Sequence, residues 1–365
     1  MLEEVELKNI SSYLYVFNLS TDLDNDVLAF THDWAEEFSH HFDKVFIYST
    51  HLGNTKLPKN VFTQELGGGT AIKRVKAILK ILAALIHIVL YSKNRFVFYH
   101  MNARVASIIG LPLKILRVPQ ILWYSHAHAS FSLRLATNFV DRVVSTSNSS
   151  LPFKTKKLRT TGHGVRDKNV FRATEIHSLE SISFLGRVSR VKRIEILIEE
   201  VSIFQKLTER KFKIYVIGPC EAPQDKRYKA ELIALAKKRN VELIFMGSIP
   251  HKNVQLELSK YDVAFNGTLQ SLDKGAIESV FAKCLLISDQ SNTLIECGYS
   301  NFSLDSSGRA LKISQQLRLM ISLSEGQKTA LREKARIETL SRHSLSSTIN
   351  KIITEFSIIV GSNEK

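Results

Sequence analysis

Residues 267–278 read GTLQSLDKGAIE and place an acid, a lysine and a glycine at a predicted strand-to-helix turn. A turn that only reverses the chain needs Gly or Asn, and a helix start needs only a cap. Backbone amides from Ser271 to Gly275 would point outward at a helix N-terminus, which attracts anions. The carboxylate of Glu278, one turn inside, can accept hydrogen bonds from a ribose diol. The alternative is that Asp273 is an ordinary N-cap and Glu278 a partner of the helix dipole.

A second charged turn, GRVSRVKR, follows the predicted strand at 181–185. Gly186 permits close approach of the backbone, and Arg187 and Lys192 can reach one anion from opposite ends of the loop. With a helix N-terminus beneath it, this arrangement suits a pyrophosphate. The alternative is that the basic side chains of the loop are solvated surface charges.

Two histidines follow a predicted strand in the first half, in the sequence WYSHAHAS. His126 and His128 would lie on one side of an extended segment. A zinc site is weakly indicated, because no thiol or carboxylate ligand stands at a suitable spacing. Hydrogen bonding or acid–base work in a cleft and a packed, structural histidine pair both remain open.

Several ligand-binding motifs are missing. The Asp-rich stretch 22–26 has Val27 where a calcium loop needs Gly and Asp33 where it needs Glu, which favours a solvated loop. The first strand is not followed by Gly-x-Gly-x-x-Gly, and the glycines at 67–69 follow no comparable turn. These absences disfavour a nicotinamide dehydrogenase. Neither a P-loop nor a Gly-x-Ser-x-Gly elbow occurs.

Short apolar runs alternate with helical patterns along the whole chain, which predicts parallel, doubly wound sheets. Two successive sets indicate an α/β protein with two Rossmann-like domains facing across a cleft, where the carboxyl ends of their strands bind ligands. We expect domains at 1–172 and 173–340, and a C-terminal helix at 341–365 that packs back on the first domain. The predicted strands are 13–18, 44–48, 96–99, 120–124, 142–145, 181–185, 212–217, 242–246, 262–266 and 285–288. The predicted helices are 27–42, 70–91, 104–116, 131–139, 192–207, 226–238, 253–259 and 274–283, with helices alone over 312–356.

The chain has 365 residues and a formal net charge of +15. Residues 51–140 hold twelve Lys or Arg against one acid, Glu65, a net charge of +11. Within them, 71–91 read AIKRVKAILKILAALIHIVLY, too short an apolar run to span a membrane. Both a helix lying on an anionic membrane surface and a partly buried domain helix with a solvated basic end fit this pattern. A nucleic-acid partner is disfavoured, because aromatic residues do not interleave the basic ones and the known binding motifs are lacking.

Three cysteines, an odd count without metal-type spacing, favour a reduced, cytoplasmic setting. The acidic start MLEEVE lacks the apolar segment of a signal peptide.

The order of these turns resembles the bacterial branch of glycosyltransferase family 4, whose members are retaining enzymes of the GT-B fold that use nucleotide sugars. His100-Met101-Asn102 is similar to the family's HMN segment, and Leu122–His126 to its LWYxH segment. The resemblance covers nearly the whole chain. The other similar motifs are Asp26-Val27-Leu28, His32-Asp33-Trp34, Lys44-Val45, Gly162-His163-Gly164-Val165 with Phe171, Phe184–Arg187 with Lys192, Val216-Ile217-Gly218, Phe245-Met246-Gly247, and Ser271–Lys274 with Glu278.

The resemblance implies a role for each matching residue. Arg187 and Lys192 would bind the donor pyrophosphate, and His126 would lie near the transferred sugar and the acceptor. Glu278 would bind the ribose, and Gly247 with Ser248 the base. Together with these, the implied donor-binding residues are Gly186, Gly218, Gln270, Ser271, Leu272, Asp273, Lys274 and Gly275, and the implied acceptor-side residues are His100, Asn102 and His128.

The implied activity is that of a hexosyltransferase that needs neither metal nor cofactor and takes a UDP- or GDP-linked sugar. The basic first domain would meet a lipid-linked or oligosaccharide acceptor at the inner face of the cell membrane, in cell-surface polysaccharide or glycolipid assembly.

The chain departs from the family pattern at three places. Gln270 replaces a Glu, Arg193 replaces a Gly, and 278–285 read ESVFAKCL where EAMACGxP is usual. Two alternatives therefore stay open. One is a sugar-nucleotide epimerase or hydrolase on the same fold, and the other is a degenerate protein that binds a sugar nucleotide without turnover.

Overall fold

The computed structural model describes residues 12–25, 27–91, 94–126, 128–170, 179–269 and 272–363. The chain forms two compact units. Unit 1 comprises Met1–Arg166 and Leu345–Lys365, and unit 2 comprises Asp167–Ser344. The chain thus passes from unit 1 to unit 2 between 166 and 167, against an expected boundary at 172.

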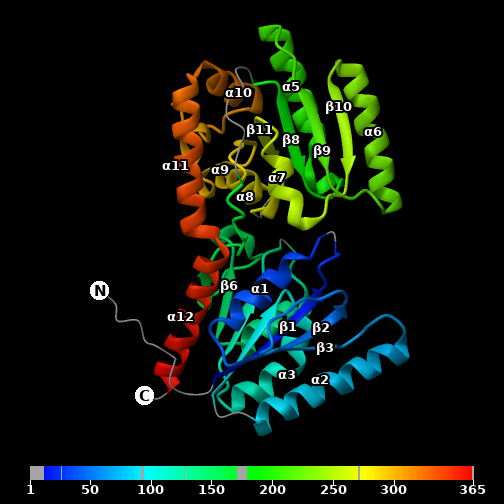
Figure 1. Cartoon of the computed structure of the whole chain (residues 1–365), viewed down its shortest axis with the longest axis vertical. Helices are drawn as coiled ribbons and strands as arrows, with labels where there is room; N and C mark the ends of the chain where they lie inside the picture. The colour runs from blue at the N-terminus through cyan, green and yellow to red at the C-terminus, as the bar shows by residue number, and fades with distance from the viewer. Residues whose placement is uncertain are drawn as a thin grey trace. The chain divides into compact units, whose positions relative to one another are not determined.

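Unit 1 is built on a seven-stranded sheet with the order β3-β2-β1-β4-β5-β6-β7, in which all neighbours are parallel (Figure 1). Two edge strands, β3 and β7, escaped prediction because they are short and mostly exposed, so they lack an apolar run. The strands are β1 (Ser12–Thr21), β2 (Lys44–Leu52), β3 (Val61–Glu65), β4 (Asn94–His100), β5 (Gln120–Trp123), β6 (Arg142–Ser145) and β7 (Leu158–Thr160). The helices are α1 (Phe30–Ser39), α2 (Ala71–Tyr91), α3 (Ala103–Ile115), α4 (Phe131–Phe139) and α12 (Leu345–Asn363).

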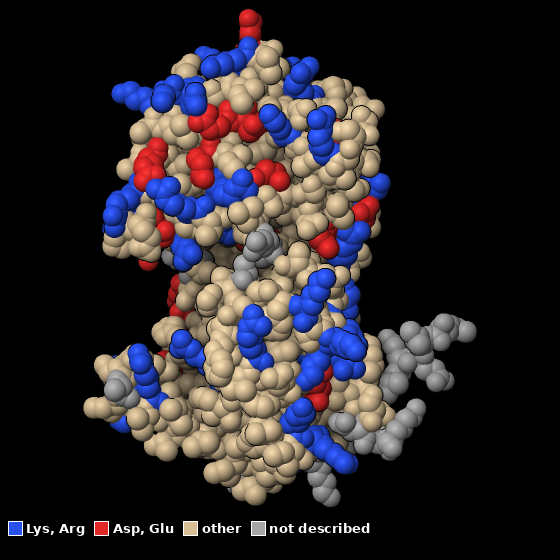
Figure 2. All heavy atoms as spheres, turned by 180° about the vertical axis from the view of Figure 1, so that it is seen from behind, with Lys and Arg blue, Asp and Glu red and all other residues tan. Residues whose placement is uncertain are grey.

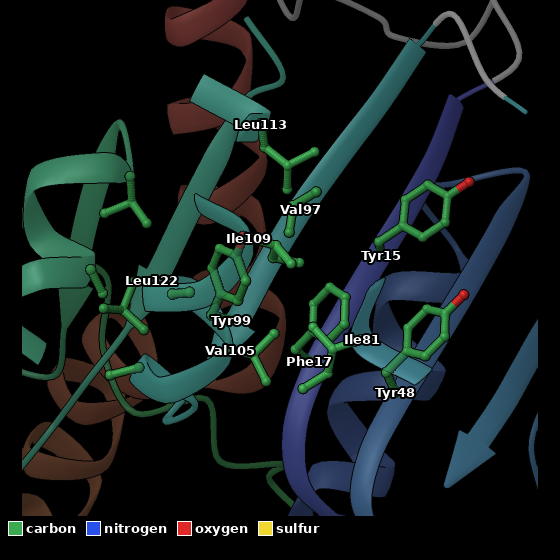
Figure 3. Packing of buried hydrophobic residues seen from close by; sticks show 14 of the residues in the cluster. Tyr15, Phe17, Tyr48, Ile81, Val97, Tyr99, Val105, Ile109, Leu113 and Leu122 are labelled. Atoms are coloured by element: carbon green, nitrogen blue, oxygen red, sulfur yellow. The ribbon is translucent and has the colours of Figure 1, made fainter. Parts of the chain in front are cut away.

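Each face of this sheet is covered by helices. Side chains alternate along a strand, so Tyr15 and Phe17 point to one face and Leu14 and Val16 to the other. The first face packs against α2, α3 and α4, and Figure 3 shows Ile81 of α2 beside the rings of strands β1 and β2. The second face packs against α1 and α12. Burial on both faces explains why the central strands read as continuous apolar runs.

The C-terminal helix α12 completes the second face. Its apolar side chains Ile349, Ile352 and Phe356 are fully buried, and the Phe356 ring lies 5.1 Å from that of Phe96 in β4. The helix begins at Leu345 and packs on unit 1. None of the helices among the described residues is long and apolar enough to cross a membrane.

Unit 2 is built on a five-stranded sheet with the order β10-β9-β8-β11-β12, again with parallel neighbours. The predicted α/β class with two doubly wound parallel sheets is confirmed. The strands are β8 (Ser181–Leu185), β9 (Lys213–Ile217), β10 (Glu242–Gly247), β11 (Val263–Asn266) and β12 (Leu285–Ser288). The helices are α5 (Ile194–Thr208), α6 (Pro223–Arg239), α7 (Val254–Leu258), α8 (Lys274–Phe281), α9 (Ser291–Glu296), α10 (Ile313–Ser322) and α11 (Glu325–His343).

Candidate functional site

Three glycines form a row at the carboxyl ends of β8, β9 and β10. The amide of Gly186 donates to the carbonyl of Ile217 at 2.9 Å, and that of Gly218 to the carbonyl of Gly247 at 2.8 Å. All three glycines have a positive φ. A side chain at Gly218 would fall well inside contact distance of the Gly186 carbonyl oxygen. The three turns therefore form one closely packed edge of backbone.

Lys192 joins this edge to the turn after β11. It ends a 3-10 turn (Arg190–Lys192), and its Nζ donates to Thr268 Oγ1 at 3.2 Å and forms an ion pair with the Asp273 carboxylate. Thr268 also donates to Asp273 at 3.0 Å. The Lys192 and Asp273 side chains are 16% and 17% exposed, so the pair is held against the protein but open to solvent on one side. The structure thus brings together two turns that are about 80 residues apart in sequence.

Helix α8 begins at this ion pair. Asp273 occupies the N-cap position with an extended backbone, but its side chain makes no capping hydrogen bond. The alternative that Asp273 is an ordinary N-cap is therefore correct for its position in the helix and wrong for its side chain. The carboxylate pairs with Lys192 and does not cap the helix. A Cβ on Gly275 would lie 2.6 Å from the Leu185 carbonyl oxygen, so this glycine lets the helix start against the end of β8. The first turn of α8 keeps its positive end without a side-chain cap.

Glu278 lies one turn inside α8 and is 3% exposed. Its Oε1 lies 3.2 Å from Lys274 Nζ and 3.8 Å from His251 Nδ1. A buried carboxylate beside a lysine and a histidine can still accept hydrogen bonds from hydroxyl groups. The surroundings of Glu278 therefore include two side chains of the site as well as the helix dipole.

The other predicted donor-side residues differ in exposure. Arg187 is exposed, and among the residues that the structure describes it forms no ion pair. Gly247 and Ser248 are exposed after the bulge that ends β10, and Leu272 is buried beneath the turn. Gln270 and Ser271 lie outside the described residues, as do Asp26 and Phe171 of the family-like motifs.

His126 and His128 lie on the exposed loop after β5 in unit 1. The His126 amide donates to the Ser150 carbonyl at 3.1 Å, and His126 Nδ1 accepts from the His128 amide at 3.0 Å. With Nδ1 used as an acceptor, the neutral ring carries its proton on Nε2, which can donate to a substrate oxygen. This geometry engages Nδ1 of His126 within the protein, and the predicted hydrogen bond to a substrate would fall to Nε2.

His100 and Asn102, at the end of β4, are buried. The His100 ring stacks on Trp123 with centroids 4.7 Å apart, and burial, assisted by the charge of His163, lowers its pKa to about 3. Asn102 accepts from the Val105 amide at 3.3 Å and so caps α3. Both residues have packing roles in unit 1, and their acceptor-side role stays a prediction.

One group of side chains among the described residues has metal-like geometry: His32, Asp33 and Glu36. Arg166 lies 3.4 Å from Asp33 and 2.9 Å from Glu36, and His32 Nε2 accepts from the Lys56 amide at 3.1 Å. The ligand atoms of this cluster are therefore engaged by protein donors.

In the Asp-rich loop, the Asp22 side chain accepts hydrogen bonds from two backbone amides, those of Asp24 and Asn54, each at 3.0 Å. The described part of this loop is thus a hydrogen-bonded turn.

Sequence reasoning missed two residues of the unit 2 site. Thr268 lies inside the quoted turn and could have been found as a hydroxyl beside Asp273. His251 comes from the separate loop after β10, and nothing in its local sequence indicates that it approaches Glu278.

The glycine positions of the resembling family are filled by basic residues with left-handed backbones. Arg193 has φ 54° and Lys283 has φ 62°. Arg193 pairs with Asp289 at 2.6 Å, and Lys283 with Glu333 at 2.8 Å. The backbone conformation that glycine favours is thus kept, and each basic side chain is held by an acid.

No protein-family profile matches the chain, and no curated protein sequence does so. Solved structures do match it. A glycosyltransferase from Rickettsia africae ESF-5 is 16% identical over 96% of this chain and 99% of its own, with a TM-score of 0.70. Sucrose-phosphate synthase from Thermosynechococcus elongatus is 13% identical over 96% and 100%, with a TM-score of 0.73. Anabaena Alr3699/HepE, solved with UDP and glucose, is 13% identical over 94% and 99%, with a TM-score of 0.67. At these identities the likeness shows the fold, and the chain therefore has the GT-B fold.

Proposed function

We propose that the protein is a retaining glycosyltransferase of family 4 that moves a sugar from a nucleotide-sugar donor to an acceptor hydroxyl. One observation carries the proposal. Lys192, the uncapped start of α8 and the buried Glu278 converge on a row of glycine turns at the carboxyl edge of the unit 2 sheet. A cation, the positive end of a helix and a close backbone suit a diphosphate, and a buried carboxylate suits a ribose.

In the proposed reaction, the bond between the anomeric carbon and the diphosphate oxygen breaks, and the diphosphate leaves with the electron pair. The acceptor oxygen forms the new bond on the same face, and its proton passes to a phosphate oxygen of the leaving group. Lys192 and Arg187 would stabilise the charge that develops on the diphosphate. His126 would donate from Nε2 to the sugar or the acceptor. No step requires a metal.

Binding of the donor requires that Lys192 change partners. Its charge is neutralised by Asp273 in the absence of ligand, so the diphosphate must compete with that carboxylate. Arg187 is exposed, so it can make the first contact with the incoming anion.

The remaining parts of the proposal concern the substrates. HepE was solved with UDP and with UDP-glucose, which favours a UDP-linked donor here, with GDP as the other expectation. The +11 charge of residues 51–140 favours a lipid-linked or anionic oligosaccharide acceptor at the inner membrane face, in polysaccharide or glycolipid assembly.

A thermal-shift panel of UDP, GDP, ADP and their sugars tests the donor site. One nucleotide family should raise Tm. Lys192→Ala should lower the affinity for that ligand about 100-fold, which corresponds to about 2.7 kcal/mol of binding free energy. The matched control is Lys213→Ala, which removes an exposed lysine at the opposite end of the same sheet. No shift with any nucleotide, or equal shifts in both variants, would defeat the proposal.

The same protein should then transfer labelled sugar only when an acceptor is added. Release or isomerisation of the sugar without acceptor would instead support the epimerase or hydrolase, and binding without turnover the degenerate protein.

A further inference from the structure

Helix α2 is apolar on two opposite faces, of which only one is covered. Its inner face packs on the sheet through Ile81, Ala84 and Ile88, and Figure 3 shows Ile81 among the buried residues of this cluster. Its outer face carries Ile72, Val75, Leu79, Leu82, Ile86 and Leu90, which are between 41% and 72% exposed. Their spacing of three or four residues aligns them along one side of the helix. We call these six residues the outer stripe.

Helix α3 extends this surface. It packs beside α2 (Figure 1), and its residues Ile108, Leu111 and Ile115 are 41%, 46% and 72% exposed at the same helical spacing. Exposed apolar side chains are normal when they are scattered, but a continuous apolar patch marks a binding surface. Two neighbouring helices of unit 1 therefore present such a surface.

The charges on the two helices themselves have a single sign. Residues 66–140, which include both helices, contain ten Lys or Arg and no Asp or Glu. Lys73, Arg74 and Lys76 are exposed in the first turns of α2, and Arg104 is exposed one turn before Ile108 on the same side of α3. Figure 2 shows far more blue than red over unit 1, in the lower part of that view.

We infer that α2 and α3 dock on an anionic lipid bilayer, with the outer stripe entering the acyl boundary and the basic residues meeting the headgroups. A basic helix with an apolar face is the pattern of interfacial helices. A second copy of this chain would place two cationic faces together, and a nucleic acid would leave the stripe in water. The inference deepens the membrane-associated part of the proposed function and rests on it only for the identity of the acceptor.

Vesicle flotation of the full-length protein tests this surface. With vesicles of mixed phosphatidylglycerol and phosphatidylcholine, the wild type should float. A variant with Val75→Gln, Leu79→Gln and Ile86→Gln should partition at least about tenfold less, because binding scales with buried apolar area. A control with Leu207→Gln and Ile233→Gln removes two apolar residues of unit 2 that are 64% and 50% exposed, and it should behave as the wild type. Vesicles of phosphatidylcholine alone should bind weakly.

A second variant guards against a folding defect. Lys73→Gln with Lys76→Gln removes two exposed charges and should lower partition about fivefold per charge, with the loss restored neither by osmolyte nor by higher protein concentration. Unchanged flotation of both variants, or no flotation of the wild type, would overturn the inference. It would also be overturned by a lipid-free dimer that the stripe variant converts to a monomer, since the stripe would then join two copies.

The outcomes separate this inference from the proposed transferase. The stripe variant should keep the nucleotide thermal shift of the wild type, because its substitutions are in unit 1 and exposed. A protein that binds nucleotide but not vesicles contradicts only the docking surface. A protein that binds vesicles but no nucleotide contradicts only the proposed function.

Discussion

The turns at the carboxyl edges of the two parallel sheets are built from different kinds of residue. In unit 2 the turns at this edge are glycines and paired charges, as in the contact between Lys192 and Asp273. In unit 1 the corresponding turn after β4 is filled by rings, and the buried His100 stacks on Trp123. Only the loop of His126 and His128 stays exposed among the unit 1 residues proposed for the site.

The difference separates two physical tasks. Charges that are paired but partly exposed can be exchanged for those of a ligand at little cost, which suits the binding of an anion. A histidine that is buried and neutral resists protonation, so it stays uncharged. We therefore expect substitutions of the paired, partly exposed charges at the unit 2 edge to change ligand binding. Substitutions of closely packed groups, whether the buried rings of unit 1 or the glycine backbone of unit 2, should change stability.

The largest change in stability is expected from a substitution in the closely packed backbone of unit 2. Gly218→Ala places a methyl group against the Gly186 carbonyl oxygen, and it should lower the free energy of unfolding by about 3 kcal/mol or more. Gly247→Ala is the matched control, because it also has a positive φ but faces open space, and about 1 kcal/mol is expected. Urea unfolding measures both. Equal losses would mean that the two turns do not approach closely.

An intermediate change is expected in the pH dependence of stability when the buried His100 of unit 1 is replaced. The pKa of His100 is about 3 in the folded protein and about 6.5 when unfolded, so the unfolded state takes up a proton first as pH falls. The neutral His100 ring makes its full contribution to the free energy of unfolding above pH 6.5. That contribution is lost as the pH falls toward 3, by about 1.4 kcal/mol per pH unit. His100→Phe keeps a ring on Trp123 and should flatten the loss of stability between about pH 6.5 and 4.5.

The control for this prediction is His128→Phe. This variant makes the same substitution at an exposed position of the same unit, so comparison of the two pH profiles separates the effect of the buried site from that of the substitution itself. Parallel pH profiles for His100→Phe and the wild type would show that His100 accepts a proton in the native state.

The smallest effect concerns the charge that replaces a glycine of the resembling family. Arg193→Ala loses the ion pair with Asp289 and keeps the left-handed backbone, whereas Arg193→Gly loses the pair and relieves the backbone. The glycine variant should be about 1 kcal/mol more stable than the alanine variant. Thermal unfolding of the two proteins decides the point, and equal stabilities would show that the backbone relaxes away from φ 54°.

Strands and helices with a buried apolar run could be predicted from the sequence, whereas the exposed edge strands β3 and β7 of the unit 1 sheet could not. The central strands of both sheets were found because both their faces are covered, whereas β3 carries one partly buried residue and four exposed ones. The glycine and lysine of the turn after β8 could be singled out from the sequence because their residue types limit what such a turn can do, and their role in donor binding stays a prediction. The partner of Lys192 was not foreseen, because the choice of Asp273 between capping and pairing depends on the packing of two distant turns.

Helix α12 belongs to unit 1, but the whole of unit 2 separates it in sequence from the rest of that unit. Unit 1 therefore cannot be completed until the end of the chain has been synthesised. Unit 2 is contiguous, Asp167–Ser344, and all of it is synthesised before the last helix. Until then, one face of the unit 1 sheet lacks Ile349, Ile352 and Phe356 and leaves Phe96 uncovered. Unit 1 begins first and is completed last, so part of an apolar face, the part that α12 covers, stays open until the end of synthesis.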